Sequence, residues 1–126
     1  MNKKFELKGK SILITAGPTQ EPIDPVRYLS NESSGKQGYA LAEAVSSLGA
    51  KVTLVSGPVN VDAPPLVKLV KVTTAKEMLQ ACQSSLPADI FISVAAVSDW
   101  RPKSCSDKKL KNDGNAPAPL ELENNI

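Results

Sequence analysis

The sequence predicts an α/β fold: a Rossmann-like, doubly wound parallel sheet with strand order 3-2-1-4 in a three-layer αβα arrangement. Apolar, β-branched runs alternate with segments of helical periodicity, and short connections join them, which is typical of right-handed βαβ crossovers. A chain of 126 residues can bury one hydrophobic core, so we expect residues 1–126 to form a single domain. Within it, residues 103–126 are expected to be flexible.

The first strand is predicted at residues 11–17, SILITAG, a short apolar run that ends before a proline. The first helix is predicted from Gly38, and Gly49 is expected to end it in a left-handed conformation. Its apolar face is expected to contain the residues that follow the i, i+3, i+4, i+7 spacing, namely Leu41, Ala44, Val45 and Leu48. A long insert rich in Pro, Asp, Arg and Asn separates this strand from this helix.

Two further strands are predicted after that helix. Residues 50–59, AKVTLVSGPV, form the second strand and end again in a Gly-Pro turn. Residues 64–72, PPLVKLVKV, form the third, and its lysines alternate with Val67 and Leu69. That alternation is typical of a strand at the edge of a sheet.

A second helix is predicted at residues 75–86, because Thr74 and Glu77 form a capping box ahead of an apolar periodic run. Residues 89–97, DIFISVAAV, are almost wholly apolar and form the fourth strand. Ligands of such sheets bind at the carboxyl ends of the strands, here at the switch point between the first and fourth strands.

The composition excludes several classes of function. A formal charge of +2 is too small to favour nucleic acid or an anionic membrane as a partner. The chain contains no histidine, which argues against triad hydrolysis and zinc chemistry. Its two cysteines lack the spacing of a metal site or a disulfide scaffold, and no apolar run approaches a membrane span, so we expect a cytoplasmic protein.

The first helix opens with SSGKQG, which is suited to bind an anion. Its N-terminus offers free backbone N–H groups and the positive end of the helix dipole, and the glycines permit close approach. The candidate phosphate ligands are Gly17, Ser33, Ser34, Gly35, Lys36 and Gly38. Alternatively, Ser33 or Ser34 only caps the helix and the glycines only allow close packing.

A short-chain dehydrogenase is a further alternative, because its dinucleotide turn also runs from a strand through small residues to a helix. The insert at residues 18–30 is too long for that turn, and the second strand ends in Ser56 and Gly57 without the acidic residue that holds a ribose. No Tyr-x-x-x-Lys is present. The sequence therefore argues against hydride transfer.

The segment after the fourth strand, SVAAVSDWRPKS, combines small residues with a carboxylate. Residues 93–96 would let a planar ring approach the backbone, and Asp99 could contact a ribose or a magnesium ion. Alternatively, Asp99 is a turn residue or pairs with Arg101. The lysine cluster DKKLKND follows, and it is either a solvated loop or a partner for a triphosphate.

Four motifs, ITAGPTQEPIDPVRYLSNESSGKQGYALA, VTLVSGP, AAVSDWRP and KKLK, resemble phosphopantothenoylcysteine synthetase, the second domain of a bifunctional enzyme of coenzyme A biosynthesis. The resemblance covers most of residues 8–112. It implies a magnesium-assisted ligase in which 4′-phosphopantothenate attacks CTP to form an acyl cytidylate, and the amine of cysteine then displaces CMP. It also implies site residues: Asn31 at the acyl cytidylate, Ser93, Val94, Ala95 and Asp99 at the nucleotide, and Lys109 and Lys111 at the triphosphate.

Arg27 is a further candidate contact for the substrate, with a salt bridge to Asp24 or Glu21 as the alternative. The usual lysine motif of the family, K-x-K-K, is incomplete here, because Asn112 follows Lys111. The family's domain continues beyond Ile126, so a non-catalytic nucleotide- or phosphate-binding fragment is the second hypothesis. The flavin-dependent half is absent from the sequence, so no flavin is expected.

The fourth strand, residues 89–97, would form an exposed apolar edge of the sheet. Such an edge is an association site unless another strand or chain covers it. We therefore expect a homodimer, or an assembly with another chain.

Overall fold

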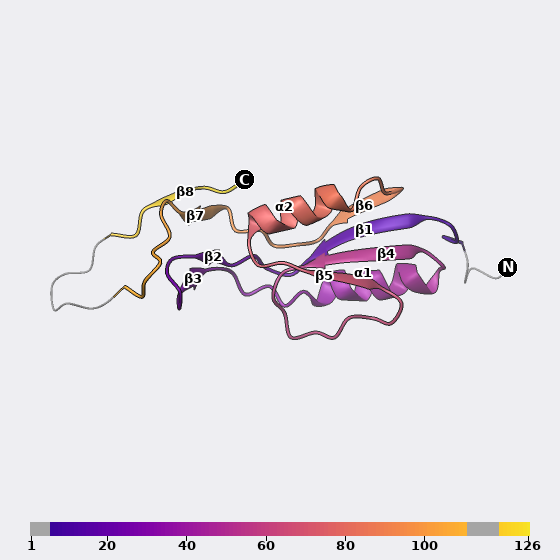
Figure 1. Ribbon diagram of the computed structural model, residues 1–126. Helices are drawn as coiled ribbons and strands as arrows, with labels where there is room; N and C mark the ends of the chain where they lie inside the picture. The colour runs from indigo at the N-terminus through magenta and orange to yellow at the C-terminus, as the bar shows by residue number, and fades with distance from the viewer. Residues whose placement is uncertain (1–5, 111–118) are drawn as a thin grey trace.

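The computed structural model describes residues 6–110 and 119–126. A parallel sheet of four strands lies at its centre, in the order β5-β4-β1-β6 (Figure 1). Its strands are β1 (Ser11–Ala16), β4 (Lys51–Ser56), β5 (Lys68–Lys71) and β6 (Ile90–Ser93). Numbered as parallel strands along the chain, this order is 3-2-1-4, so the predicted fold class and topology are confirmed.

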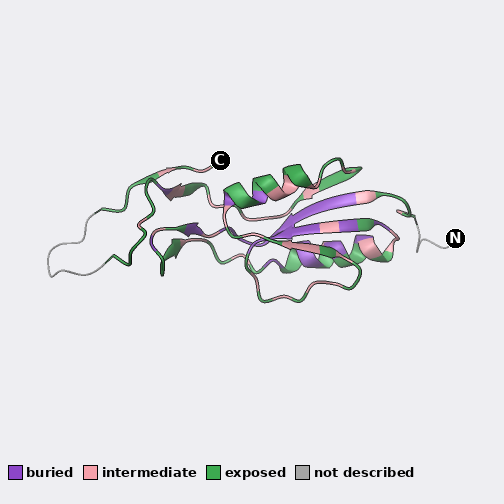
Figure 2. Cartoon of the chain, viewed as in Figure 1, coloured by how far each residue is buried: buried purple, intermediate pink, exposed green. Residues whose placement is uncertain are grey.

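One helix covers each face of the sheet, as the three-layer prediction requires (Figure 1). Helix α1 (Lys36–Ser47) packs with β1 and β4 on one face, around Ile14, Leu54 and Tyr39. Helix α2 (Ala75–Ser84) packs on the other, where Met78 meets Leu13 and Val55. Strands β1 and β4 are buried along most of their length (Figure 2), because both faces are covered.

The buried face of α1 differs from the predicted one. The helix begins at Lys36 and buries Gly38, Tyr39, Ala42 and Val45, whereas Ala44 is exposed. A Cβ added at Gly38 would lie 2.5 Å from the Cβ of Ala16. The helix therefore packs with Gly38 against β1, and its buried face is rotated from the predicted one. The predicted helix end is confirmed, since Gly49 has φ +94°.

The predicted start of α2 is confirmed in detail. Thr74 Oγ1 accepts from the backbone N–H of Glu77 at 3.1 Å, and Glu77 Oε1 accepts from the backbone N–H of Thr74 at 2.9 Å. The helix ends at Ser84, earlier than predicted. Because Pro87 disfavours a helical conformation at Leu86, the helix stops before it.

Two antiparallel strand pairs, which the sequence analysis did not predict, lie beyond the carboxyl end of the sheet. The insert folds as a hairpin of β2 (Glu21–Pro22) and β3 (Tyr28–Leu29). Strand β7 (Trp100–Pro102) pairs with β8 (Leu122–Asn124), and β2 packs beside β7. We call these four strands, with the β2–β3 turn at residues 23–27 and residues 103–110, the extension (Figure 1). Strand β8 lies within the stretch that was predicted to be flexible.

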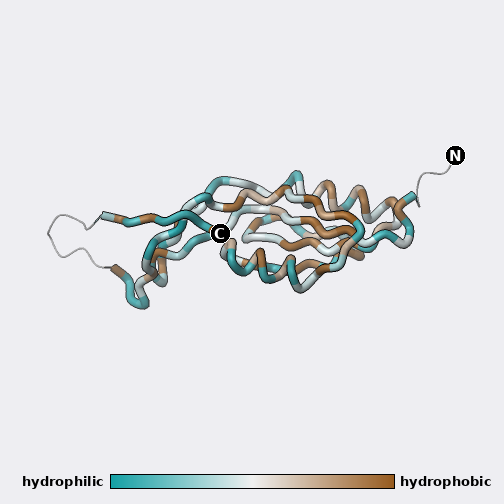
Figure 3. Tube along the Cα trace, turned by 90° about the horizontal axis from the view of Figure 1, so that it is seen from above, coloured by the Kyte–Doolittle hydropathy of each residue, from teal (hydrophilic) through white to brown (hydrophobic). Residues whose placement is uncertain are grey.

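The extension and the sheet differ in composition along the chain (Figure 3). Hydrophobic residues lie along the central strands, whereas the segment that runs through β8 to the C-terminus is mostly hydrophilic. Strand β6 is the end of the parallel sheet among the described strands, and Phe91 on it is 51% exposed. The described residues contain no helix of the length and apolarity that crossing a membrane requires.

Candidate functional site

Strands β1 and β6 continue side by side past their ends, which creates the predicted switch point. The backbone N–H of Val94 donates to the carbonyl of Thr15 at 3.1 Å, and that of Ala96 donates to the carbonyl of Gly17 at 2.9 Å. Thr19 N–H then donates to the carbonyl of Ala96 at 3.3 Å. Backbone hydrogen bonds therefore join the start of the insert to the start of the segment after β6.

A small cavity of about 150 Å³ lies where α1 begins, beside this junction. It brings together all six predicted phosphate ligands and Val94, one of the predicted nucleotide contacts. Gln37, which was not among the predicted ligands, also lines it. The signal was available, because Gln37 stands inside the SSGKQG motif. The lining comprises Gly17, Ser33, Ser34, Gly35, Lys36, Gln37, Gly38 and Val94.

The N-terminus of α1 begins at a glycine without a side-chain cap among the described residues. Gly35 is the N-cap residue, with φ 76° in the left-handed region, and no side chain of the described residues caps the helix. Ser34 Oγ accepts from the N–H of Lys36 at 3.3 Å, one residue beyond a standard cap. Gly35 and not a serine therefore occupies the N-cap position, although Ser34 accepts from one N–H group of the first turn.

Glycines in and beside this cavity stand where an added side chain would collide with its neighbours. Gly17 and Gly35 both have positive φ, and a Cβ at either would approach Val59 Cγ1 to 2.9 or 2.7 Å. At Gly57, a Cβ would collide with the carbonyl oxygen of Pro18. The backbone conformation and the contact with Val59 thus explain why small residues stand here.

Asn31 bridges the two loops of the switch point. Its Nδ2 donates to the carbonyl of Ala96 at 2.8 Å, and its Oδ1 accepts from the N–H of Ser33 at 3.0 Å. Thr19, a buried residue that the sequence analysis missed, adds a second link: its Oγ1 accepts from the N–H of Ser98 at 3.0 Å. The side chain of Asn31 is exposed, so it lies at the surface of the site.

The predicted nucleotide contacts in and after β6 differ in their exposure and in whether they line the small cavity. Val94 lines the small cavity, Ser93 and Asp99 are exposed, and Ala95 is half-buried with its N–H 3.5 Å from Thr15 Oγ1. Arg101 Nε donates to Glu123 Oε1 at 2.9 Å. The alternative in which Arg101 pairs with Asp99 is therefore wrong.

Arg27 and the lysine cluster lie together in the extension. Arg27 Nη2 donates to the carbonyl of Leu110 at 3.3 Å, and Arg27 Nε lies 3.9 Å from Asp24 Oδ2. The salt-bridge alternative for Arg27 is thus realised with Asp24. Lys109 is exposed, and the described residues lining the small cavity do not include it. Lys111 lies outside the described residues.

Asp24, in the turn between β2 and β3, has a fully buried side chain. Its Oδ1 accepts from the N–H groups of Val26 at 2.9 Å and Arg27 at 2.8 Å, and its Oδ2 accepts from the N–H of Leu110 at 3.1 Å. The bond from Leu110, assisted by the other two N–H groups and the Arg27 charge, outweighs burial and lowers the pKa of Asp24.

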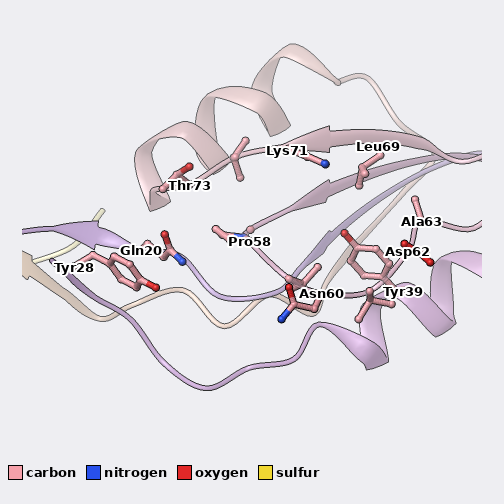
Figure 4. A pocket seen from close by; sticks show the side chains of 14 residues that line it. Gln20, Tyr28, Tyr39, Pro58, Asn60, Asp62, Ala63, Leu69, Lys71 and Thr73 are labelled. Atoms are coloured by element: carbon pink, nitrogen blue, oxygen red, sulfur yellow. The ribbon is translucent and has the colours of Figure 1, made fainter. Parts of the chain in front are cut away.

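A larger cavity of about 830 Å³ lies beside the carboxyl ends of β4 and β5 (Figure 4). Polar side chains of separate elements line it, among them Gln20 from the insert, Tyr39 from α1, Asp62 from the loop between β4 and β5, and Lys71 from β5. Val59 also lines it, and this side chain covers Gly17 and Gly35, which line the small cavity. The sequence analysis missed this cavity, because its residues share no motif.

Neither metal-binding clusters nor a disulfide occur in the described part of the chain. Residues 6–110 and 119–126 contain no group of three or more His, Cys, Asp or Glu side chains placed to hold a metal ion. Cys82 and Cys105 are free thiols, and burial raises the pKa of the Cys82 thiol. Cys82 is therefore less reactive than an exposed cysteine.

Comparison with known proteins connects this site to a family. The family described as DNA/pantothenate metabolism flavoprotein C-terminal domain matches residues 7–126. The coenzyme A biosynthesis bifunctional protein CoaBC of Vibrio parahaemolyticus is 58% identical over 106 residues, which are 83% of this chain and 27% of that protein. The Bacillus subtilis protein of the same name is 48% identical over 122 residues, 95% of this chain and 30% of that protein.

Solved structures agree with the sequence comparisons. The C-terminal domain of a CoaBC protein superimposes with a TM-score of 0.81 at 44% identity, over 99% of this chain and 57% of that one. A Cab2 mutant solved in complex with phosphopantothenate-cysteine has a TM-score of 0.72 at 20% identity, over 93% of this chain and 57% of that one, which shows the shared fold.

The chain spans less than a third of the curated relatives it matches. Within that span, the family match covers nearly all described residues, from the first strand through β8. The resemblance noted in the sequence motifs is thereby confirmed. The chain belongs to the family of the DNA/pantothenate metabolism flavoprotein C-terminal domain, whose relatives here are coenzyme A biosynthesis proteins.

Proposed function

We propose that this chain forms the nucleotide- and substrate-binding part of a phosphopantothenate–cysteine ligase of coenzyme A biosynthesis. The observation that carries the proposal is the small cavity at the open N-terminus of α1, lined by the residues of the SSGKQG motif. Asn31 stands between this cavity and the segment after β6. An anionic ligand and its reacting carboxyl group would therefore lie between two loops that are already joined.

The proposed reaction has two steps. In the first, a carboxylate oxygen of 4′-phosphopantothenate attacks the α-phosphorus of CTP, an acyl–oxygen–phosphorus linkage forms and pyrophosphate leaves. In the second, the amine of cysteine attacks the acyl carbon, CMP leaves, the amine loses a proton, and an amide forms. Both steps need stabilised phosphate charge, which backbone N–H groups at a helix N-terminus supply.

The residues of the site have separate proposed roles. The first turn of α1, with Lys36, binds phosphate oxygens, and the Asn31 amide holds the acyl cytidylate by donating and accepting hydrogen bonds. The small residues Ser93, Val94 and Ala95 allow the nucleotide to approach the backbone, and Asp99 adds a polar contact. The cations Lys109 and Lys111 neutralise triphosphate charge, and Arg27 contacts the substrate.

The residues of this site are compatible with Mg²⁺ that binds together with the nucleoside triphosphate. Magnesium at phosphate sites is commonly bound through one or two carboxylates, with the remaining positions filled by substrate phosphates and water. The described residues have no three-ligand cluster, and Asp99 is an exposed carboxylate on the segment after β6. We propose Asp99 as the protein ligand, while bound Mg²⁺ would supply neutralisation of triphosphate charge.

The partners proposed are small molecules and a second chain over β6. The exposed side chains of Ile90, at 40%, and Phe91, at 51%, favour such a cover, because an open apolar edge strand pairs readily. A homodimer or an assembly with another chain would supply it. We propose a cytoplasmic location and no bound flavin.

The test is a titration of the chain with Mg-CTP, with and without 4′-phosphopantothenate, in which heat and pyrophosphate release are followed together. Binding and pyrophosphate release, both reduced at least about tenfold by Asn31→Ala, support the ligase. Gln80→Ala, on the exposed face of α2, is the matched amide control and should leave both unchanged. Absence of Mg-CTP binding by the folded chain would contradict the proposal.

A second candidate is a part that holds nucleotide or phosphate without catalysing the reaction. It is favoured by one observation: Lys109 is separate from the described lining of the small cavity. Its result in the same titration is binding of Mg-CTP without pyrophosphate release.

A further inference from the structure

The insert and the lysine cluster are held together by both backbone polar groups of one residue, Leu110. The N–H of Leu110 donates to Asp24 Oδ2 at 3.1 Å, and its carbonyl accepts from Arg27 Nη2 at 3.3 Å. A third bond links the same two segments, because the N–H of Ser106 donates to the carbonyl of Ile23 at 3.0 Å. Residues 106–110 are thus attached to the turn between β2 and β3.

Asp24 accepts hydrogen bonds from nearby and from distant residues, and it does so with different carboxylate oxygens. Oδ1 closes the hairpin turn by accepting from the N–H groups of Val26 and Arg27. Oδ2 is left for Leu110, which is 86 residues away along the chain. A turn needs only the first set of bonds, so the second set and the burial of this charged side chain call for another explanation.

The position of Leu110 supplies that explanation. It follows Lys109 directly, so whatever fixes the Leu110 peptide also fixes the backbone of that lysine. Lysine itself is long and flexible, and a charge that must meet a phosphate benefits from an anchored backbone, because less conformational entropy is then lost on binding.

We propose that Asp24 is a positioning residue that anchors residues 106–110 to the insert and thereby places Lys109, with Arg27 as the second point of attachment. The anchoring is independent of any ligand. The placement of Lys109 toward the nucleotide rests on the function proposed above, so the experiment separates the two.

Asp24→Asn is the decisive variant. An amide keeps one oxygen to accept from Val26 and Arg27, so the turn persists, but its NH₂ group would face the N–H of Leu110, donor against donor. We expect amide hydrogen exchange at Leu110 to become at least about tenfold faster, while exchange in β1 and β4 stays unchanged. Glu43→Gln removes one carboxylate charge from the exposed face of α1 and is the matched control.

Arg27→Met provides a graded second variant, because it removes the bond to the Leu110 carbonyl and the ion pair with Asp24 but keeps the aliphatic stem and the bond from Leu110 N–H to Asp24. It should accelerate exchange at Leu110 less than Asp24→Asn does. Unchanged exchange at Leu110 in Asp24→Asn, with the sheet intact, would overturn the anchoring, whether or not the chain binds nucleotide.

The placement of Lys109 is tested by a double-mutant cycle on Mg-CTP affinity, if the wild-type chain binds it. Asp24→Asn and Lys109→Met should each weaken binding, and Asp24→Asn should add nothing in the Lys109→Met background. Additive effects would overturn placement through Lys109 while leaving the anchoring intact. A wild-type chain that does not bind Mg-CTP overturns the proposed function and, with it, the placement; the exchange result then decides the anchoring alone.

Discussion

The two helices of this molecule begin in opposite ways. At α2, Thr74 and Glu77 satisfy each other's backbone groups, and the buried carboxylate of Glu21 accepts from the N–H of Ala75 at 3.1 Å. At α1, Gly35 stands at the N-cap, no described side chain caps the helix, and a cavity opens beside the first turn. The chain thus supplies its own anion to the N-terminus of α2 and none to that of α1, where we propose that a phosphate group binds.

The two helix N-termini therefore have different expected roles: that of α2 contributes to stability, and that of α1 is the proposed ligand site. Both helix N-termini lie toward the carboxyl edge of the sheet, and both have first-turn N–H groups without an intrahelical partner and a positive dipole end. The insert contributes to both regions: Glu21 closes the end of α2, and Asn31 stands beside the open end of α1. Substitutions near α2 should therefore lower stability alone, whereas those near α1 should also lower ligand affinity.

The largest effect is expected from Gly38→Ala. Its Cβ would lie 2.5 Å from Ala16 Cβ, and overpacking of about 3 kcal/mol is offset by about 1 kcal/mol of better helix propensity. We expect a net loss of about 2 kcal/mol in the free energy of unfolding, measured with urea, and weaker Mg-CTP binding. Ala40→Ser, on the exposed face of the same helix, is the control. Full stability in Gly38→Ala would contradict the close approach of α1 to β1.

Glu21→Gln should come next. It keeps an oxygen to accept from Ala75 but removes the charge at the helix N-terminus, for an expected loss of about 1.5 kcal/mol. Urea unfolding measures it, with Glu43→Gln as the exposed carboxylate control. Mg-CTP affinity should remain that of the wild type. A fall in affinity without a loss of stability would reverse the assignment of this helix end.

A pair of capping variants compares the two ends directly. Thr74→Ala removes the acceptor for Glu77 N–H and should cost about 1 kcal/mol. Ser34→Ala should cost only about 0.3 kcal/mol, because Ser34 is not the N-cap residue and its bond to Lys36 N–H is 3.3 Å long. Thermal unfolding of both variants is the measurement. Equal losses would show that α1 depends on a serine cap after all.

The smallest expected effect concerns pH and the extension. The Leu110 N–H bond, together with the other N–H groups and the Arg27 charge, holds the pKa of Asp24 below its ordinary value of 3.8. A lowered folded pKa means that the stability from ionised Asp24 is present above pH 3.8 and is lost as pH falls through the folded pKa. The carboxyl resonance of Asp24, followed by NMR, should titrate below pH 3.8, and a midpoint at or above it would contradict the bond.

Residues with local signals were predictable, and those with distant partners were not. The capping box at Thr74, the glycine end of α1 at Gly49 and the parallel strands depend on neighbouring residues, so periodicity and turn chemistry identified them. The apolar face of α1 was misplaced at Ala44, because the contact of Gly38 with Ala16 decides the rotation of the helix. Strands β7 and β8 were missed, since each has only three residues and needs the other.

By itself, the sequence determined the fold class, the strand order and the group of residues at the first turn of α1. These follow from short-range spacing and from the few ways in which βαβ units can be connected. Tertiary structure alone decided that Glu21 closes α2, that Asn31 joins two loops and that Asp24 holds Leu110. Each of these bonds joins residues at least 54 positions apart, and which carboxylate finds which N–H depends on packing that no local pattern encodes.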